Sequence, residues 1–327
     1  MCWRGRLVLV TGAGGFIGSH LSEALVDAGA NVRALVHYNA LGSRGWLDRS
    51  PKADAMQIIA GDVCDRESVQ SAVDGCSIVF HLAALIGIPY SYNAPASYVR
   101  TNIEGTLNIL QAAREQGVKR VVHTSTSEVY GSARYTPIDE AHPLQAQSPY
   151  AATKIGADKI AETFYLSFGL PVVTVRPFNT FGPRQSARAV IPSILAQCLN
   201  SETIQLGSVT PTRDFNFISD TVDGFLKAGC ADAVFGETIN LGSGRETSIA
   251  DVAKLIASVT GREINLNEDP ARVRPKTSEI ERLVADNSKA RRLLGLQPRV
   301  TLEEGIARTA EWMLQHQDRF RPGVYTV

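Results

Sequence analysis

The sequence predicts an α/β fold built on a doubly wound parallel sheet, with a smaller α/β lobe after it. Apolar runs rich in β-branched residues alternate with helical patterns in the first half of the chain, at residues 7–10, 31–36, 56–60, 77–83, 120–125 and 171–177. Their hydrophobicity is continuous rather than alternating, which is typical of strands covered by helices on both faces. Such sheets bind ligands at the carboxyl ends of their strands.

The second half of the chain has shorter apolar segments broken by Gly and Pro, as in FGPRQ and INLGSGRET. We therefore predict one domain over residues 1–177 and a smaller lobe over residues 178–327. Because no Gly/Ser-rich linker separates the two, we expect them to pack closely.

Charge and composition exclude several classes of protein. The 33 basic and 33 acidic residues cancel, so there is no overall attraction for nucleic acid or an anionic membrane. No apolar stretch reaches the roughly 20 residues of a spanning helix, and we expect a cytoplasmic protein. The five cysteines are scattered without metal-like spacing. We predict reduced, mostly buried thiols and no metal site.

A glycine-rich turn follows the first predicted strand, where TGAGGFIGSH spaces Gly12, Gly15 and Gly18 three residues apart. Glycine permits a tight turn and lets backbone N–H groups approach a pyrophosphate, which the positive end of the following helix attracts. Phe16 and Ile17 extend the same contact. With a strand before it and a helix after it, this turn predicts a Rossmann domain that binds a nicotinamide dinucleotide.

Two other strand ends would contact this cofactor. Asp62 and Val63 follow the third strand, where an adenine amino group would lie, although an Asp at this place also serves as a helix cap. Ala83 and Ala84 follow the fourth strand and are small enough to lie beside the pyrophosphate.

The end of the second strand lacks the Asp or Glu that usually binds the ribose hydroxyls of NAD. The residues there are Val36, His37 and Tyr38. No carboxylate would repel a 2′-phosphate, and His37 or Arg44 would be able to contact one. We expect NAD as the cofactor, with NADP as the alternative.

Tyr150 and Lys154 lie four residues apart in SPYAATK, a segment with a helical pattern, so both side chains should share one helix face. The ammonium group of Lys154, helped by an oxidised nicotinamide, would lower the pKa of Tyr150. The resulting phenolate would accept a hydroxyl proton, which makes this a candidate proton-transfer pair.

The fifth strand and its extension, VVHTSTSEVYG, carry Thr126 and Glu128 two residues apart. Both should point to the same side if the chain stays extended. Thr126 would hydrogen-bond the reacting hydroxyl, and Glu128 would remove a carbon-bound proton made acidic by a neighbouring ketone. The alternative for Glu128 is a solvated loop glutamate.

The chain resembles the extended short-chain dehydrogenase/reductases that act on nucleotide sugars, through TGAGGFIGSH, AGDVCD, HLAAL, TSTSEVYG, YAATK, RPFNTFGPRQ, RDFNFISD and NLGSG. Within that family it is most similar to LegB-type 4,6-dehydratases of N-acetylglucosamine nucleotides, through YNALGSRGWL, YTPIDEAHPLQAQSPY and FNTFGPRQSARAVIP. The resemblance spans nearly the whole chain. It implies a UDP- or GDP-linked N-acetylglucosamine substrate and a 4-keto-6-deoxy product.

The resemblance also implies roles for the candidate residues. Thr126, Tyr150 and Lys154 match a catalytic triad, and Glu128 matches the base that removes the carbon-5 proton after oxidation at carbon 4. Ser127 stands where many hexose 4,6-dehydratases have an Asp that protonates the leaving hydroxyl. Either Glu128 serves both steps, or Ser127 holds a water that does so.

Three other functions stay open at this point. UDP-glucuronate decarboxylases share the T-S-E stretch and are the closest enzymatic alternative. A 4-epimerase is a weaker alternative, because it has no need of Glu128. A cofactor-sensing scaffold is the non-enzymatic alternative, and the intact Thr126, Tyr150 and Lys154 argue against it.

The second lobe carries candidate substrate-binding residues. Arg176 and Asn179 end the sixth strand and should face the cleft, and Arg188, Arg213 and Arg274 lie in later loops. An arginine donates two parallel hydrogen bonds to a phosphate, although a lone loop arginine is more often solvated. The helices expected at about 97–116 and 149–168 carry apolar residues on more than one face. The resemblance implies that they form the helix bundle of a homodimer, and burial within one subunit is the alternative.

Overall fold

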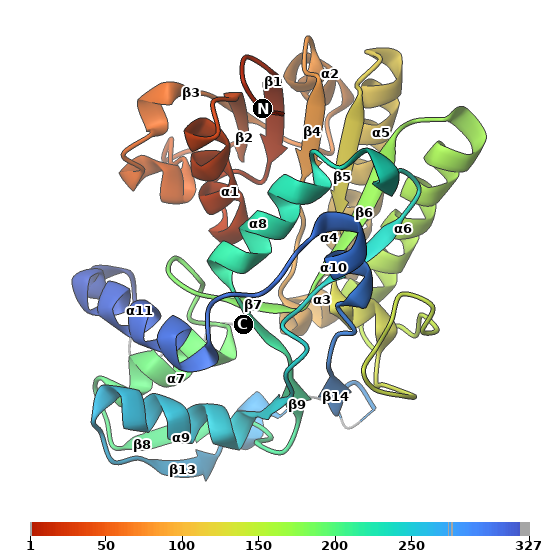
Figure 1. Cartoon of the computed structure of the whole chain (residues 1–327). Coiled ribbons are helices and arrows are strands. Elements are labelled where there is room, and N and C mark those ends of the chain that lie inside the picture. Colours follow the sequence, from red (N-terminus) through yellow and green to blue (C-terminus); the bar gives the residue numbers. More distant parts are fainter. Residues whose placement is uncertain (1, 274, 276, 321–327) are drawn as a thin grey trace.

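The computed structural model describes residues 2–273, 275 and 277–320. Seven parallel strands form its central sheet, in the order β11-β6-β5-β4-β1-β2-β3 (Figure 1). They are β1 (Leu7–Thr11), β2 (Asn31–His37), β3 (Met56–Gly61), β4 (Ile78–His81), β5 (Arg120–Thr124), β6 (Val172–Pro177) and β11 (Thr238–Leu241). The predicted fold class and the six predicted strands are confirmed.

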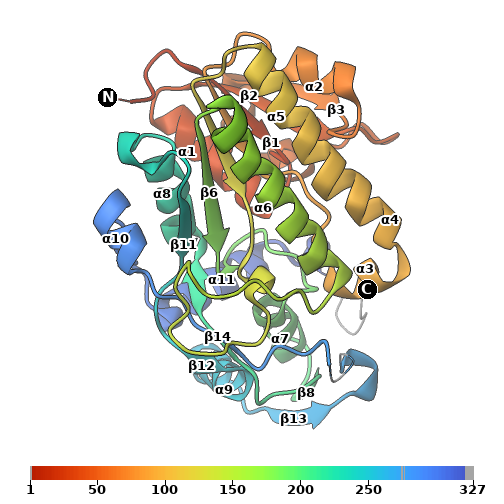
Figure 2. The same ribbon diagram turned by 90° about the vertical axis from the view of Figure 1, so that its right-hand side faces the viewer.

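Helices cover both faces of this sheet (Figure 2). One face carries α1 (Phe16–Asp27) and α8 (Ile218–Ala228); the other carries α2 (Arg66–Val73), α5 (Gly105–Glu115) and α6 (Pro149–Phe168). Val8 and Val10 pack toward α1 and α8, whereas Leu9 packs toward the other layer. Because both faces of β1 meet apolar layers, its sequence is continuously hydrophobic.

The strand order places β1 between β2 and β4. The chain runs outward in one direction through β2 and β3, and in the other through β4, β5 and β6. The connections from β1 and β4 therefore diverge to opposite faces, and the crevice at their carboxyl ends is the expected ligand site.

Residues after 177 build a second lobe and also complete the central sheet. Thr238 of β11 lies opposite Thr174 of β6, and α8 packs beside α1. The predicted boundary at residue 177 therefore divides the chain in sequence but not in space. The segment from α8 to β11 lies beyond this boundary, yet it packs into the Rossmann layers.

The second lobe lies below the carboxyl ends of the large sheet in Figure 1. Its described helices are α7 (Val190–Cys198), α9 (Ile249–Thr260) and α11 (Leu302–Gln315), and α10 (Ser288–Leu294) packs against β11. Its strands are β7 (Asn179–Phe181), β8 (Thr203–Leu206), β9 (Thr212–Arg213), β10 (Phe215–Phe217), β12 (Thr247–Ser248), β13 (Asn265–Glu268) and β14 (Arg282–Leu283).

The predicted helix at about 97–116 consists of three consecutive parts. They are α4 (Pro95–Tyr98), a π-helical segment (Val99–Glu104) and α5, and α3 (Ile88–Asn93) precedes them. The helix predicted at 149–168 is α6. Within the described ranges, no helix is long and apolar enough to cross a membrane.

The prediction that all cysteines are reduced is wrong for two of them. Cys2 and Cys230 form a disulfide, with Cα atoms 6.0 Å apart. The cause is the packing of α8, which brings Gly229 against the ring of Trp3 at the start of the chain. Sequence spacing gave no sign of this pair because its members are 228 residues apart. Cys64, Cys76 and Cys198 are free thiols.

Candidate active site

The turn between β1 and α1 depends on glycine. Gly12 has a φ of +68°, and a Cβ there would lie 2.9 Å from the backbone nitrogen of Ala83. Gly15 precedes α1 without a side-chain cap. The first N–H groups of α1, including those of Phe16 and Ile17, therefore have no intrahelical acceptor. This cradle fits a pyrophosphate.

The turn is fixed by two further residues. A Cβ on Gly18 would overlap the carbonyl oxygen of Gly12, so α1 packs directly on the turn. Thr11 Oγ1 accepts two successive backbone N–H groups at 3.1 Å, the second from Ala83. This places Ala83 and Ala84 beside the turn. Thr11 was not among the predicted site residues, because a threonine within a strand is common and gives no local signal of this role.

The loop after β2 lies over the glycine-rich turn. The N–H of Trp46 donates to the carbonyl of Gly14 at 2.9 Å. Arg44, the expected phosphate contact, forms an ion pair with Asp48 at 3.1 Å, and His37 is exposed. The loop thus brings a cation and a carboxylate to this end of the site. Sequence reasoning considered the cation alone.

Asp62 and Val63 follow β3, as expected. Asp62 Oδ1 accepts the N–H of Cys64 at 2.9 Å, whereas the cap of α2 is Asp65, which accepts the N–H of Ser68 at 2.8 Å. The helix-cap role that competed with a cofactor role for Asp62 therefore belongs to Asp65. Val63 is buried.

Tyr150 and Lys154 share α6, whose first turn is capped by Ser148 Oγ accepting the N–H of Ala151 at 3.1 Å. Their exposed fractions are 7% and 4%. The ring of Tyr150 packs edge-on against Tyr98, with centroids 6.3 Å apart. The candidate proton-transfer pair is therefore held on a rigid, buried element.

The backbone beyond Thr126 does not stay extended, which corrects the expectation. Ser127–Tyr130 form a 3₁₀ turn, and Thr126 Oγ1 caps it by accepting the N–H of Glu128 at 3.2 Å. Thr126 and Glu128 are half-buried and Ser127 is buried. The charge of Glu128 contributes to a raised pKa of the Tyr150 phenol.

Burial shifts the pKa values of both members of the pair. It raises the pKa of Tyr150, and a hydrogen bond with Thr126 opposes this. It lowers the pKa of Lys154 to about 8. Lys154 Nζ donates to the carbonyl of Thr124 at 2.6 Å. That Lys154 and an oxidised nicotinamide lower the pKa of Tyr150 stays a prediction for the complex with cofactor.

Sequence reasoning also missed Asn102, which lies in the π-helical segment. Its amide donates to Leu85 O and to Thr153 Oγ1, both at 3.0 Å, and accepts the N–H of Leu85 at 2.9 Å. Asn102 thereby ties α6 to the segment after β4. An asparagine inside an otherwise helical pattern was the available signal.

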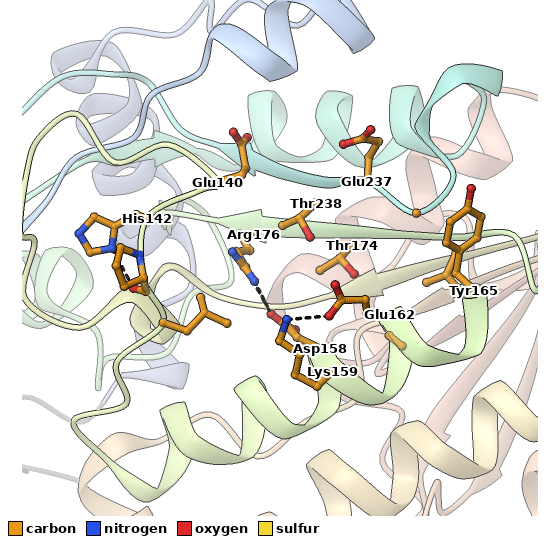
Figure 3. A pocket seen from close by; sticks show the side chains of 15 residues that line it. Glu140, His142, Asp158, Lys159, Glu162, Tyr165, Thr174, Arg176, Glu237 and Thr238 are labelled. Carbon is orange, nitrogen blue, oxygen red and sulfur yellow. Dashed lines mark hydrogen bonds and ion pairs between the residues drawn. The ribbon is translucent and has the colours of Figure 1, made fainter. Parts of the chain in front are cut away.

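The expectation that Arg176 faces the cleft, where it could contact the sugar or the diphosphate, is wrong. Arg176 is 5% exposed and pairs with Asp158 at 2.9 Å, and its Nη1 donates to the hydroxyl of Tyr130 at 2.9 Å. Figure 3 shows Arg176 and Asp158 pointing toward each other. The side chain is directed toward α6 because the buried carboxylate of Asp158 attracts it.

The remaining substrate candidates lie in different surroundings. Asn179 Oδ1 is buried without a partner, and Arg188 is exposed beside Gly87 at the mouth of the site. Arg213 is 7% exposed and pairs with Glu279 at 3.2 Å. Arg274 lies outside the described residues. The orphaned acceptor of Asn179 fits a ligand hydroxyl or amide.

A segment of the second lobe contacts the chain just before α6, the helix that carries Tyr150 and Lys154. Ser278 Oγ donates to the carbonyl of Gln147 at 2.5 Å and lies 2.5 Å from the hydroxyl of Tyr92 on α3. This contact links the second lobe to α3 and to the residue before the cap of α6. No group of three His, Cys, Asp or Glu side chains in the described part of the chain could hold a metal ion.

The doubly wound sheet, the glycine-rich turn and the Tyr150–Lys154 pair define a Rossmann enzyme of the short-chain dehydrogenase/reductase class. A family model described as GDP-mannose 4,6 dehydratase matches residues 9–309. The chain belongs to this family of NAD-dependent epimerases and dehydratases, and it is an enzyme of nucleotide-sugar metabolism.

Three relatives show how the family divides. A UDP-glucose 4-epimerase of Mycolicibacterium smegmatis is 34% identical, covering 93% of this chain and 97% of the relative. A UDP-N-acetyl-alpha-D-glucosaminuronate decarboxylase of Bacillus cytotoxicus is also 34% identical, over 93% and 96%. The structure of DesIV, a dTDP-glucose 4,6-dehydratase of Streptomyces venezuelae with NAD bound, has a TM-score of 0.87 at 29% identity, over 95% and 98%.

Proposed function

We propose that this protein is a nucleotide-sugar 4,6-dehydratase that converts UDP- or GDP-linked N-acetylglucosamine to its 4-keto-6-deoxy product. The observation that carries the proposal is Glu128, a half-buried carboxylate in the turn that Thr126 caps, whose charge acts on the pKa of Tyr150. A carboxylate here suits removal of a carbon-bound proton, a step that an epimerase does not need.

NAD is the proposed cofactor, and NADP is the alternative. The residues that would hold it are Gly12, Gly15, Phe16, Ile17 and Gly18 at the pyrophosphate, Asp62 and Val63 at the adenine, His37 at the ribose, and Ala83, Ala84, Tyr150 and Lys154 along the remainder. The NAD-bound neighbour supports NAD. When bound, the nicotinamide supplies a reversible store for a hydride.

The protein residues would perform the proton transfers. Tyr150 accepts the proton of the carbon-4 hydroxyl, which Thr126 holds, while Lys154 supplies positive charge. Oxidation at carbon 4 makes the carbon-5 hydrogen acidic, and Glu128 removes it. The carbon-6 hydroxyl then leaves as water. Glu128 would then take up a proton from solvent and pass it to carbon 5. With the hydride returned to carbon 6, no cofactor would be consumed.

Glu128 is also the proposed acid for the leaving hydroxyl. Glu128 and Asp158 are the carboxylates that act on the pKa of Tyr150, and Asp158 is buried and ion-paired. Ser127 is 3% exposed and is a poor acid. Once protonated by carbon 5, Glu128 holds the proton that the carbon-6 hydroxyl needs.

Asn179, Arg188, Arg213 and Arg274 are the proposed substrate-binding residues. Arg213, in its buried setting, suits a diphosphate oxygen, and Asn179 has an acceptor without a partner. Decarboxylation of a glucuronate nucleotide is the second candidate. It is favoured by the same Thr126, Ser127 and Glu128 stretch and by the relative named as a decarboxylase.

A homodimer formed through α5 and α6 is a further part of the proposal. Leu166 and Phe168 are 71% and 50% exposed near the end of α6, where Phe168 lies against Arg114 of α5. Apolar side chains exposed on a helix suit a contact with a second copy. We also propose a cytoplasmic enzyme without a nucleic-acid partner, and the balanced charge supports the second point.

Mass spectrometry of separate incubations tests the assignment. The purified protein would receive UDP- or GDP-linked N-acetylglucosamine, glucose or glucuronate, without added reductant. We expect loss of water from an N-acetylglucosamine nucleotide. Loss of carbon dioxide from the glucuronate would instead assign the decarboxylase, and an unchanged mass for every substrate would reject both.

A further inference from the structure

Asp158 lies on α6 one helical turn beyond Lys154 and two turns beyond Tyr150. Residues four apart on a helix share a face, so all three side chains point toward the sheet. Asp158 is only 5% exposed. A buried carboxylate is unstable unless it is paired and hydrogen-bonded, so its partners indicate why it is there.

The partners of Asp158 come from the adjacent strands β5 and β6 and from the residue that follows β5. Its Oδ2 accepts from Ser125 Oγ at 2.7 Å and from Arg176 Nη2 at 2.9 Å, and its Oδ1 pairs with His123 Nε2 at 3.1 Å. Burial raises the pKa of Asp158, but His123 and Arg176 outweigh it and hold the pKa at about 2. Asp158 is therefore ionised throughout the neutral range.

The other ionisable groups around Lys154 give it no negative charge. His81 on β4 and His123 on β5 are buried, and burial lowers the pKa of each, helped by the charge of Lys154. Burial also lowers the pKa of Lys154, and the charge that opposes this is Asp158. Both imidazoles are therefore neutral at pH 7.

The far side of the Asp158–Arg176 pair lines a cavity of about 330 Å³ behind α6 (Figure 3). Glu140, Glu162 and Glu237 also line this cavity. Glu162 pairs with Lys159 and Glu237 with Lys289, both at 2.6 Å, and Glu140 accepts the N–H of Asn240 at 2.8 Å. Of the four carboxylates, Asp158 is the one that lies a single helical turn from Lys154 on α6.

We propose that Asp158 is the buried counter-ion that keeps Lys154 protonated, and that Arg176 serves to hold Asp158 in place. Asp158 is thus a positioning residue, since it acts through Lys154 and does not touch the reacting atoms. The inference rests on the proposed function only in taking Tyr150 and Lys154 as the proton-transfer pair. It also explains why Arg176 is directed away from the sugar.

The direct test is an NMR titration of Lys154 in the full-length protein carrying ε-¹³C-labelled lysine. The resonance is assigned by its loss in Lys154→Arg. We expect Asp158→Asn to lower the pKa of Lys154 by about one unit or more, because an opposite charge is removed from its surroundings. Asp158→Glu keeps the charge and should retain the wild-type titration. An unchanged titration in Asp158→Asn would overturn the proposal.

A double variant separates this role from a merely structural one. Asp158→Asn leaves Arg176 buried without its carboxylate, so this variant will lose thermal stability. Asp158→Asn/Arg176→Gln removes both charges and should recover stability while the pKa of Lys154 stays low. Recovery of the wild-type Lys154 titration in the double variant would mean that Asp158 acts only by supporting Arg176, against the proposal.

The pH profile of carbon-4 oxidation provides a second readout. Lys154 acts in its charged form, so a lower pKa moves the alkaline limb of the profile to lower pH in Asp158→Asn. Asp220→Asn is the matched control. Asp220 is a buried carboxylate on α8 that accepts the N–H groups of Arg299 and Val300 at 3.0 Å. Asp220→Asn should lose stability but keep the alkaline limb at its wild-type pH. A shift of that limb in Asp220→Asn would contradict the proposal.

The two experiments also distinguish failure of this inference from failure of the proposed function. The NMR titration needs no substrate, so it decides on Asp158 whichever reaction the enzyme performs. A lowered Lys154 pKa in Asp158→Asn, together with no dehydration of any N-acetylglucosamine nucleotide, would reject the dehydratase and keep the counter-ion.

Discussion

The two sides of the active site are built differently. On the sheet side, Tyr150 and Lys154 come from a helix of 20 residues and are buried, and Lys154 bonds the end of β5. On the side of the second lobe, Arg188 is exposed in a loop and Arg213 lies on a strand of two residues. If the proposed roles hold, proton transfer would lie on rigid, buried elements, and part of the recognition would lie on loops and short strands that can change without disturbing them.

The largest effect should come from the sheet side. Tyr150→Phe keeps the ring against Tyr98 and removes the hydroxyl, so kcat should fall by about 10²- to 10⁴-fold. Thermal unfolding should stay close to wild type. A variant that keeps the wild-type rate of substrate oxidation would show that Tyr150 is not the acid–base group and would remove the basis of the comparison.

Glu128→Gln should separate two steps on the same side. It should still oxidise carbon 4 slowly, as seen by formation of reduced nicotinamide, but dehydration should fall by about 10²-fold or more, because the amide cannot accept the carbon-5 proton. Ser127→Ala is the control, and its dehydration rate should fall much less. Dehydration by Glu128→Gln at the wild-type rate would exclude Glu128 from the mechanism.

On the second-lobe side, Arg213 and Arg188 should differ from each other. Arg213→Gln should raise KM by about 10-fold or more through the loss of a buried charge-assisted hydrogen bond, and Arg188→Gln by only a few-fold, because exposed charges contribute little. Neither should change the pH profile of kcat. A large fall in kcat with unchanged KM for Arg213→Gln would place it with the catalytic residues instead.

The smallest predicted effect is on stability in acid. The pKa of Asp158 in the folded protein, about 2, lies below its ordinary value of 3.8. Its contribution is therefore present above about pH 4 and lost as the pH falls toward 2, and it amounts to about 2 kcal/mol. Thermal unfolding between about pH 4 and pH 2 should show a smaller loss of stability for Asp158→Asn/Arg176→Gln than for the wild-type protein. An equal loss in both proteins would contradict the assignment.

The parts of the fold and site that the sequence predicted are those with local signals. Continuous apolar runs predicted the strands, glycine spacing predicted the cofactor turn, and a spacing of four placed Tyr150 and Lys154 on one helix face. Each signal arises within a few residues, because it reflects backbone geometry and burial on both faces of one sheet.

The missed parts depend on contacts distant in sequence. Arg176 was predicted to bind the ligand because its strand ends at the cleft. Only the packing of α6 shows that it forms an ion pair with Asp158 instead. Thr11 and Asn102 have ordinary residue types whose roles come from distant backbone partners. The disulfide of Cys2 and Cys230 depends on the return of α8 to the first domain.

The central claim is tested most directly by a single reaction in deuterium oxide. The purified protein would be incubated with UDP- or GDP-linked N-acetylglucosamine, and the product would be examined by mass spectrometry and NMR. The account predicts loss of water and one solvent deuterium at carbon 5, with no net reduction of cofactor. A nucleotide sugar whose mass is unchanged and whose carbon 5 keeps its original hydrogen would contradict it.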